Sequence, residues 1–140
     1  MLILTNDASL TLGPNQSVTF NLEILHTGCA ECHRINSGAV TLRMQKAIYD
    51  IFFKANIGST TAGDAAQLTM LLNGSPMTET TMVSTTAAVG DVNSVACETG
   101  VRTCCCGPKM VPQPEMITIV NNGETTIVVE QPLLKIKRVA

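Results

Sequence analysis

The segment Ala47-Ile-Tyr-Asp-Ile-Phe-Phe-Lys-Ala-Asn-Ile57 decides the fold class of this chain. Apolar side chains recur at every second position from Tyr49 to Ile57, with polar or aromatic residues between them. A period of two places successive side chains on opposite faces of a β-strand. A helix through residues 44–55 fits less well, because the segment is rich in β-branched and aromatic residues. The segment is therefore predicted to be a half-buried strand.

Neighbouring segments carry the same signal. Ser17 to His26 alternates, with Val18, Phe20, Leu22 and Ile24 expected on one face. Gln67 to Leu72 is a short apolar run that stops at Asn73-Gly74, a pair that favours positive φ and reverses the chain. We therefore predict two further strands, the second of which ends in a tight turn.

The C-terminal third is predicted to be a meander. Its expected strands cover residues 116–123, 125–130 and 133–139, with turns at Asn122-Gly123 and Gln131-Pro132. Many short strands with regular turns and almost no helix indicate an all-β, single-domain antiparallel sandwich of the jelly-roll type. We expect residues 1–16 to form an N-terminal arm or anchoring strand and residues 17–140 to form the jelly roll.

The composition favours a protein with a covered surface. Only 14% of the 140 residues are charged and 45% are apolar, whereas soluble domains average about 25% charged residues. The net charge of −2 and the scattered basic residues argue against nucleic-acid binding. The N-terminal residues lack the pattern of a signal peptide, and no apolar run is long enough for a membrane helix. We expect no nucleic-acid or membrane partner.

The order of these strands resembles the jelly roll of the C1q/tumour-necrosis-factor-like family, including small bacterial and bacteriophage structural proteins. The resemblance rests on the tyrosine-bearing strand, the Leu-Leu-Asn-Gly strand and the final Leu133-Leu-Lys-Ile-Lys-Arg-Val139. Ala47 stands where the family usually has a glycine, and Cys104-Cys-Cys-Gly-Pro108 has no counterpart in the animal members. Receptor-binding residues of animal cytokines are therefore not transferred.

The resemblance implies a homotrimer. In it, an inner sheet formed by the first, tyrosine-bearing and last strands together with residues 116–120 packs about a threefold axis. The side chains at this axis would form the trimer interface. The alternative is that each of these residues is an ordinary core residue. The candidate interface residues are Phe20, Tyr49, Phe53, Ile119, Leu134 and Ile136.

The cysteines leave several alternatives open. Cys29 and Cys32 have the spacing with which two thiolates grip one zinc ion, and His33, Cys97, Cys104, Cys105 and Cys106 could complete the ligands. The same cysteines could form disulfides or stay free as buried thiols. Cys29-Ala-Glu-Cys32-His33 also spells a haem-attachment motif, but the export that haem attachment requires has no signal here. No cofactor is expected, apart from a possible structural zinc.

Catalysis is not expected. His26 or His33 could activate a nearby cysteine, but no orienting acid has a recognisable spacing. The first hypothesis is a virion structural protein, a trimeric capsid decoration or head-fibre module of a bacteriophage. Its partners would be itself and a major capsid or other virion protein. The alternatives are a bacterial surface or spore-coat module and a small zinc- or carbohydrate-binding protein.

Overall fold

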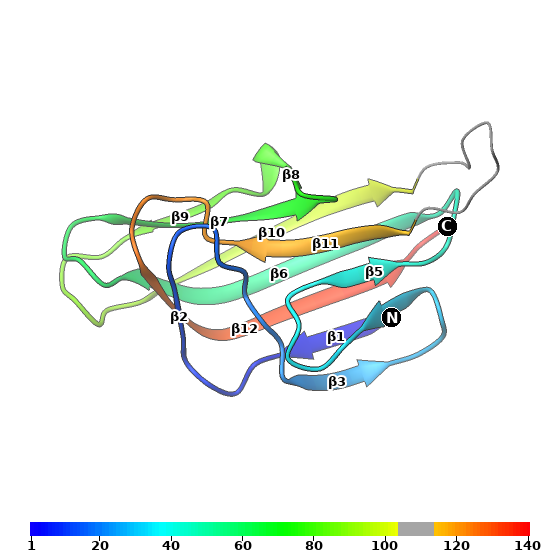
Figure 1. Cartoon of the computed structure of the whole chain (residues 1–140), viewed down its shortest axis with the longest axis horizontal. Coiled ribbons are helices and arrows are strands. Elements are labelled where there is room, and N and C mark those ends of the chain that lie inside the picture. The colour runs from blue at the N-terminus through cyan, green and yellow to red at the C-terminus, as the bar shows by residue number, and fades with distance from the viewer. Residues whose placement is uncertain (104–113) are drawn as a thin grey trace.

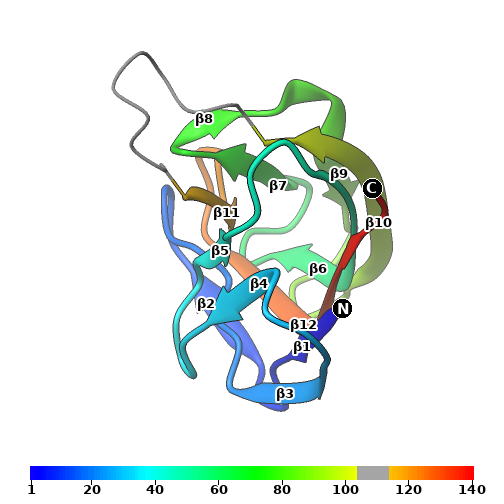
Figure 2. The same cartoon turned by 90° about the vertical axis from the view of Figure 1, so that its right-hand side faces the viewer.

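Two antiparallel sheets stack on each other in the computed structural model, which describes residues 1–103 and 114–140 (Figure 1). Viewed along the long axis, the sheets form two layers that enclose the core (Figure 2). Sheet I has the strand order β10 (Asn93–Arg102), β6 (Ile48–Ser59), β12 (Ile127–Arg138), β1 (Leu2–Thr5) and β3 (Leu22–His26), and β2 (Leu10–Leu12) also pairs with β12.

Sheet II forms the opposite layer. Apart from a short 3-10 helix, η1 (Thr78–Thr80), all described elements are strands. The architecture is therefore the predicted all-β sandwich of jelly-roll type. The order in sheet II is β4 (Glu31–His33), β5 (Val40–Leu42), β11 (Glu115–Val120), β7 (Ala65–Leu72) and β8 (Ser75–Pro76), and β9 (Met82–Thr85) pairs with β7.

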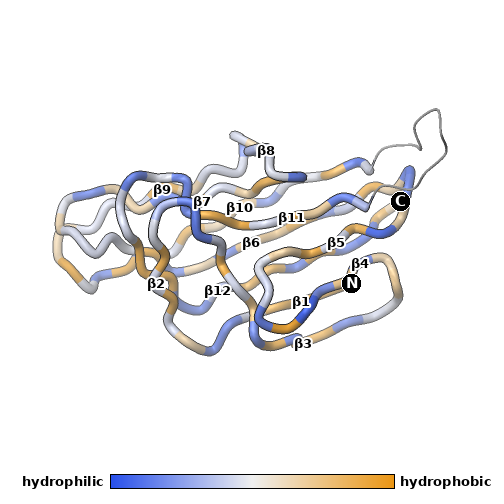
Figure 3. The backbone as a smooth tube through the Cα atoms, viewed as in Figure 1, coloured by the Kyte–Doolittle hydropathy of each residue, from blue (hydrophilic) through white to orange (hydrophobic). Residues whose placement is uncertain are grey.

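The tyrosine-bearing strand is β6, and its predicted alternation is confirmed. Every second side chain from Tyr49 to Ile57 is at most 4% exposed and points into the core, while Asp50 and Lys54 point outward. Figure 3 shows this alternation of apolar and polar residues along the strands. Burying apolar side chains from both sheets is the main force that stabilises such a sandwich.

The tight turn at Asn73-Gly74 is confirmed. Asn73 has φ 52° and Gly74 has φ 83°, and the turn joins β7 to β8 with Leu72 paired to Ser75. These positive φ values suit asparagine and glycine, which visit the left-handed region with little strain. The Asn73 side chain accepts a 2.8 Å hydrogen bond from the Met116 backbone N–H, which ties the turn to β11.

The expected strand from Ser17 to His26 is in fact divided between the two sheets. Val18 and Phe20 are fully buried, and isolated bridges connect Ser17 to Val120 and Phe20 to Ser37 on the side of sheet II. The chain then crosses to β3 in sheet I, where Leu22 is 45% and Ile24 is 57% exposed. The prediction that these four side chains share one buried face was therefore wrong.

The N-terminal residues belong to the sandwich, contrary to the expected arm. β1 lies between β12 and β3 inside sheet I, with Leu2 opposite Ile136 and Leu4 opposite Leu134. Leu2 and Leu4 are fully buried. Both edges of β1 are hydrogen-bonded within the sheet, so β1 has no free edge with which to pair as an extra strand on another protein.

The expected C-terminal meander was also wrong in two respects. β11 belongs to sheet II and β12 to sheet I, so these strands are not hydrogen-bonded neighbours. Gln131-Pro132 is not a turn between two strands but an irregularity inside β12, where the register with β6 shifts between Glu130 and Leu133 and Gln131 has φ 51°. Such a bulge accommodates proline, which cannot donate a hydrogen bond to a neighbouring strand.

Candidate interaction surface

The outer face of sheet I, which points away from the core, is the main candidate site. None of the elements among residues 1–103 and 114–140 packs over its central strands. β6 contributes Asp50, Phe52 and Lys54 to this face. β12 contributes every second residue from 133 to 137, namely Leu133, Lys135 and Lys137. A sheet face of this kind is a natural contact surface, because it is broad and carries both apolar and charged groups.

Strand register places the charged and apolar groups next to one another. Lys135 and Glu98 flank Phe52 from opposite sides, and Ile3 lies beyond Lys135 on β1. Leu133 lies opposite Lys54 on the neighbouring strand. Phe52 and Leu133 are half-buried, so apolar surface remains open to a partner.

Two hollows lie on this side of sheet I. One, of about 330 Å³, has both carboxylate and lysine side chains in its lining, including Asp50, Glu98, Lys135 and Lys137 around Phe52. The other, of about 550 Å³, extends along β6 and β10 past Asn56, whose side-chain oxygen accepts a 2.8 Å hydrogen bond from Ser94 Oγ. Both are open depressions and not closed cavities, which suits contact with another protein better than enclosure of a small molecule.

Asp50 and Glu98 form a carboxyl pair in the first hollow. A hydrogen bond with the Asp50 side chain, followed by the negative charge of Asp50, raises the pKa of Glu98, and Lys135 opposes this rise. Asp50 lies opposite Gly100, so its side chain and that of Glu98 are diagonal neighbours on the two strands. Like charges this close are less favourable than separated ones until a cation or a proton relieves the repulsion.

The outer face of sheet II has a different character. The only Asp, Glu, Lys or Arg residues within its described strands are Glu31 and Glu115, and both are buried. A row across three strands instead presents Cys32, Thr41 and Met116. This face is uncharged, with exposed aliphatic side chains such as Met116 at 43% and Val83 at 54%.

The six candidate trimer-interface residues lie inside the chain and not on its surface. All of them are at most 1% exposed within a single copy, so no partner can contact them. Ile119 lies on β11 of sheet II, opposite the sheet to which it was assigned. The interface prediction was therefore wrong for these residues, which are core residues: Phe20, Tyr49, Phe53, Ile119, Leu134 and Ile136.

Tyr49 has a structural role at one end of the sandwich. Its hydroxyl donates a 2.7 Å hydrogen bond to the Ala30 carbonyl and accepts one of 3.2 Å from the Met44 backbone N–H. Burial, the main cause, raises the pKa of Tyr49. Nearby, the buried Glu31 carboxylate lies 3.6 Å from the amino group of Met1. These polar contacts join β6 to the residue before β4, and β4 to the residue before β1, and so connect the two sheets.

The described cysteines occupy different environments. Cys29 and Cys32 are exposed free thiols, and Cys97 is a half-buried thiol whose pKa burial raises to about 11. Cys97 packs against the core, and its burial and raised pKa both disfavour the reactive thiolate. Cys104, Cys105 and Cys106 lie outside the described residues, so the zinc and disulfide hypotheses that involve them stay predictions.

The two histidines make backbone contacts. His26 Nε2 lies 3.0 Å from the Glu31 carbonyl, and His33 Nε2 lies 2.8 Å from the Ser37 carbonyl. Each Nε2 therefore donates a hydrogen bond to a carbonyl, which ties β3 to β4 through His26 and β4 to the following loop through His33. Within residues 1–103 and 114–140, no group of three or more His, Cys, Asp or Glu side chains is arranged to hold a metal ion.

Sequence reasoning missed the outward-facing residues of sheet I as a candidate site. The signal was present in the alternation itself, because Asp50 and Lys54 stand between the apolar residues of β6, and Lys135 and Lys137 stand between those of β12. The aromatic Phe52 breaks the polar outward pattern of β6 and marks where that face is partly apolar.

In the described part of the chain, no helix is long and apolar enough to cross a membrane.

Comparisons with known proteins show the fold but not the function. No protein-family model and no curated protein sequence matches this chain. Among solved structures, the vertex protein P5 of PRD1 superposes with a TM-score of 0.55 at 12% identity, covering 99% of this chain and 96% of that one. Murine APRIL at pH 5.0 superposes with a TM-score of 0.56 at 12% identity, covering 96% and 98%.

The chain therefore has a jelly-roll fold like that of tumour-necrosis-factor-like proteins, as the resemblance implied. A family 35 carbohydrate-binding module from an environmental isolate gives a TM-score of only 0.46 at 14% identity, covering 100% of this chain and 98% of the module.

Proposed function

We propose that this protein is a non-enzymatic virion structural protein, a trimeric capsid decoration or head-fibre module of a bacteriophage. The observation that carries the proposal is the uncovered outer face of sheet I, which exposes parts of Phe52 and Leu133 among charged residues. The fold supports it, because PRD1 P5 is described as a vertex protein and shares this fold along nearly its whole length.

Self-association would cover this face. Only 14% of the residues are charged, and exposed aliphatic side chains remain on several strands of the single chain. A cyclic trimer packs one copy against the next, so that each copy covers part of its neighbour's face. The trimer proposed from the sequence is retained, with outward residues such as Phe52 in place of the buried ones.

The remaining surface would serve attachment to a major capsid protein or another virion protein. The uncharged outer face of sheet II suits this role, because burying it desolvates few charges. We expect the protein in the virion after assembly in the host cytoplasm, with no nucleic-acid or membrane partner. A bacterial surface or spore-coat role would require the same self-association and differs only in location.

Carbohydrate binding is the less favoured function. Sugar-binding sites usually stack rings on exposed aromatic side chains. The chain has no Trp, one Tyr and three Phe, and Tyr49, Phe20 and Phe53 are fully buried. Phe52 is thus the single aromatic side chain available at the surface, and it lies between Lys135 and Glu98.

Native mass spectrometry of the purified protein tests the assembly, and proteomic analysis of purified phage particles tests the location. Three chains of 14.8 kDa should give a species of about 44 kDa. Phe52→Asp should convert it to monomers, whereas Thr118→Asp on the outer face of sheet II should leave it trimeric. A wild-type protein that stays monomeric at all concentrations, or that is missing from particles, would contradict the proposal.

A further inference from the structure

Charges of opposite sign lie side by side on the outer face of sheet I. Asp50 and Glu98 form the acidic corner, which spans β6 and β10. Lys135 and Lys137 form the lysine column on β12, with Lys137 opposite Asp50 and Lys135 opposite Phe52. Both groups line the same hollow of about 330 Å³. Within this hollow, the side toward β10 is therefore acidic and the side toward β12 is basic.

A cyclic assembly brings two different parts of the same surface together. In such a contact, residue i of one copy meets residue j of the next, and the reverse contact is made with the third copy. The acidic corner and the lysine column are suitable halves of this contact, because they are opposite in charge and lie on different strands of one face. Charge complementarity of this kind fixes the register of a complex and suppresses wrong arrangements.

We propose that the acidic corner of each copy docks on the lysine column of the next copy around the ring. This inference rests on the proposed self-association through the outer face of sheet I, and it names the residues that set its direction. Phe52 and Leu133 supply the apolar centre of the contact, and the charges surround it. The lysines of the neighbouring copy then relieve the repulsion between Asp50 and Glu98.

The proposal predicts assembly that weakens in acid. In the free chain, Asp50 raises the pKa of Glu98, and in the assembly a neighbour's lysines would lower it again. Assembly therefore releases protons and becomes tighter as the pH rises through the pKa of Glu98 in the free chain. The other charged side chains on this face of the described strands are Lys54, Arg102 and Glu130. Their charges act on Glu98 in the free chain and in the assembly alike.

The test uses charge reversal in the full-length chain, measured by sedimentation velocity. The doubles Asp50→Lys with Glu98→Lys, and Lys135→Glu with Lys137→Glu, should each raise the dissociation constant at least about tenfold, because like charges then face each other. The quadruple variant carries both reversals and restores opposite charges in every contact. Its dissociation constant should lie within about threefold of the wild-type value, because the effects of combined substitutions rarely add up perfectly.

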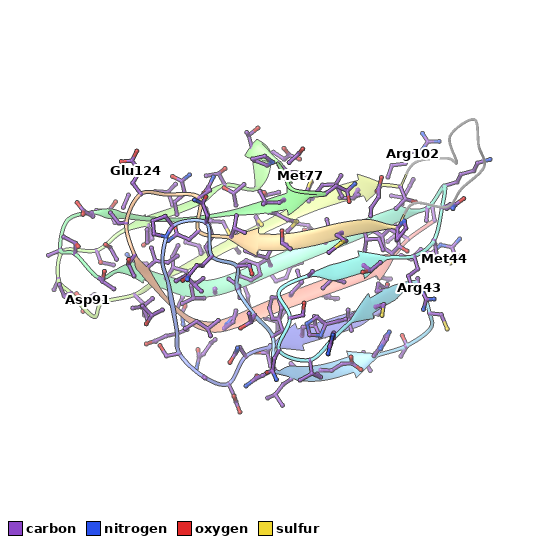
Figure 4. The ribbon with its side chains drawn as sticks, in the orientation of Figure 1. Arg43, Met44, Met77, Asp91, Arg102 and Glu124 are labelled. Atoms are coloured by element: carbon purple, nitrogen blue, oxygen red, sulfur yellow. The ribbon has the colours of Figure 1, made fainter. Side chains whose placement is uncertain are left out.

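Asp91→Lys with Glu124→Lys is the matched control. Figure 4 shows both residues at the opposite end of the molecule from Arg102. Arg102 marks the end near the acidic corner, because it lies two positions after Gly100, which pairs with Asp50. The control changes the net charge as the first double does but should leave assembly unchanged. Circular dichroism checks that each double variant folds. If a double does not fold, the neutral variant Glu98→Gln replaces the acidic-corner double, and Lys135→Gln replaces the lysine-column double.

The outcomes separate the two proposals. A monomeric wild-type protein would overturn the proposed self-association and this inference together. A trimeric wild type whose doubles remain fully assembled, or whose folded quadruple stays dissociated, would overturn this inference alone. Acidification from pH 7 to pH 5 should weaken wild-type assembly more than that of an Asp50→Asn and Glu98→Gln double, and an equal response would also count against the inference.

Discussion

The outer faces of the two sheets differ in charge, although the strands beneath them bury the same kinds of side chain. Sheet I presents lysines and carboxylates around Phe52, whereas the described strands of sheet II present threonine and aliphatic residues. On the inner side, both sheets contribute fully buried Ile, Leu, Phe or Met residues to one core. The inner alternation therefore stabilises the sandwich, and the outer chemistry determines which partners each sheet can accept.

The largest expected effect separates the inner and outer sides of a single strand. Phe53→Ala should lower the free energy of unfolding by about 3–5 kcal/mol, because Phe53 is fully buried in the core. Phe52→Ala should lower it by less than about 1 kcal/mol, because Phe52 is only half-buried on the outer face. Urea unfolding of dilute monomer measures both. Equal losses would show that sheet I has no free outer face.

The next effect compares an inward thiol of sheet I with an outward thiol of sheet II. The pKa of Cys97 is raised to about 11, so at pH 8 its thiolate fraction is about a hundredfold below that of a thiol at 9. Half-burial slows the reagent further. Iodoacetamide should therefore modify Cys32 much faster than Cys97 in the native protein, as read by peptide mass mapping. In urea, where both thiols are exposed, the two rates should become similar. Similar rates already in the native protein would contradict the inward placement of Cys97.

A smaller effect concerns the charge on the outer face of sheet I in the unassembled chain. A carboxyl group whose folded pKa is raised binds more protons in the folded state, so its contribution to stability increases as the pH falls through that range. Glu98→Gln should therefore be slightly more stable than wild type at pH 7, with an advantage that shrinks toward pH 4. Urea midpoints at concentrations too low for assembly measure this. An advantage that grows in acid would reverse the assignment.

The smallest expected effect is a charge placed on the uncharged face. Met116→Lys should change the free energy of unfolding by no more than about 0.5 kcal/mol, because Met116 is 43% exposed and points away from the core. Self-association should remain intact. Loss of the trimer would move the self-contact to sheet II, whereas loss of incorporation into particles alone would support attachment through that face.

The sequence could predict which residues share a face but not what that face meets. From Tyr49 to Ile57 the alternation identified the buried side of β6 correctly. Whether that side packs on the second sheet of the same chain or on another copy depends on tertiary structure, and both environments favour the same apolar residues. For that reason six core residues were expected at an interface.

The crossing between sheets was equally invisible in the alternation. Val18, Phe20, Leu22 and Ile24 form an uninterrupted period-two pattern, yet the chain leaves sheet II after Phe20 and enters sheet I at Leu22. β3 then lies at the edge of sheet I, where all five of its residues are exposed. Periodicity reports local side-chain direction and carries no information about the sheet to which a strand belongs.

The placement of β12 has a consequence for the time at which the protein can fold. β12 lies between β6 and β1, and it joins residues that are far apart in the sequence, as in the pair Leu2 and Ile136. Sheet I therefore cannot form in its native order until residues 127–138 have left the ribosome. Contacts of such long sequence separation slow folding, because the intervening chain must first be ordered. The same strand carries Lys135 and Lys137, so a growing chain has no complete assembly surface before residues 127–138 have been synthesised.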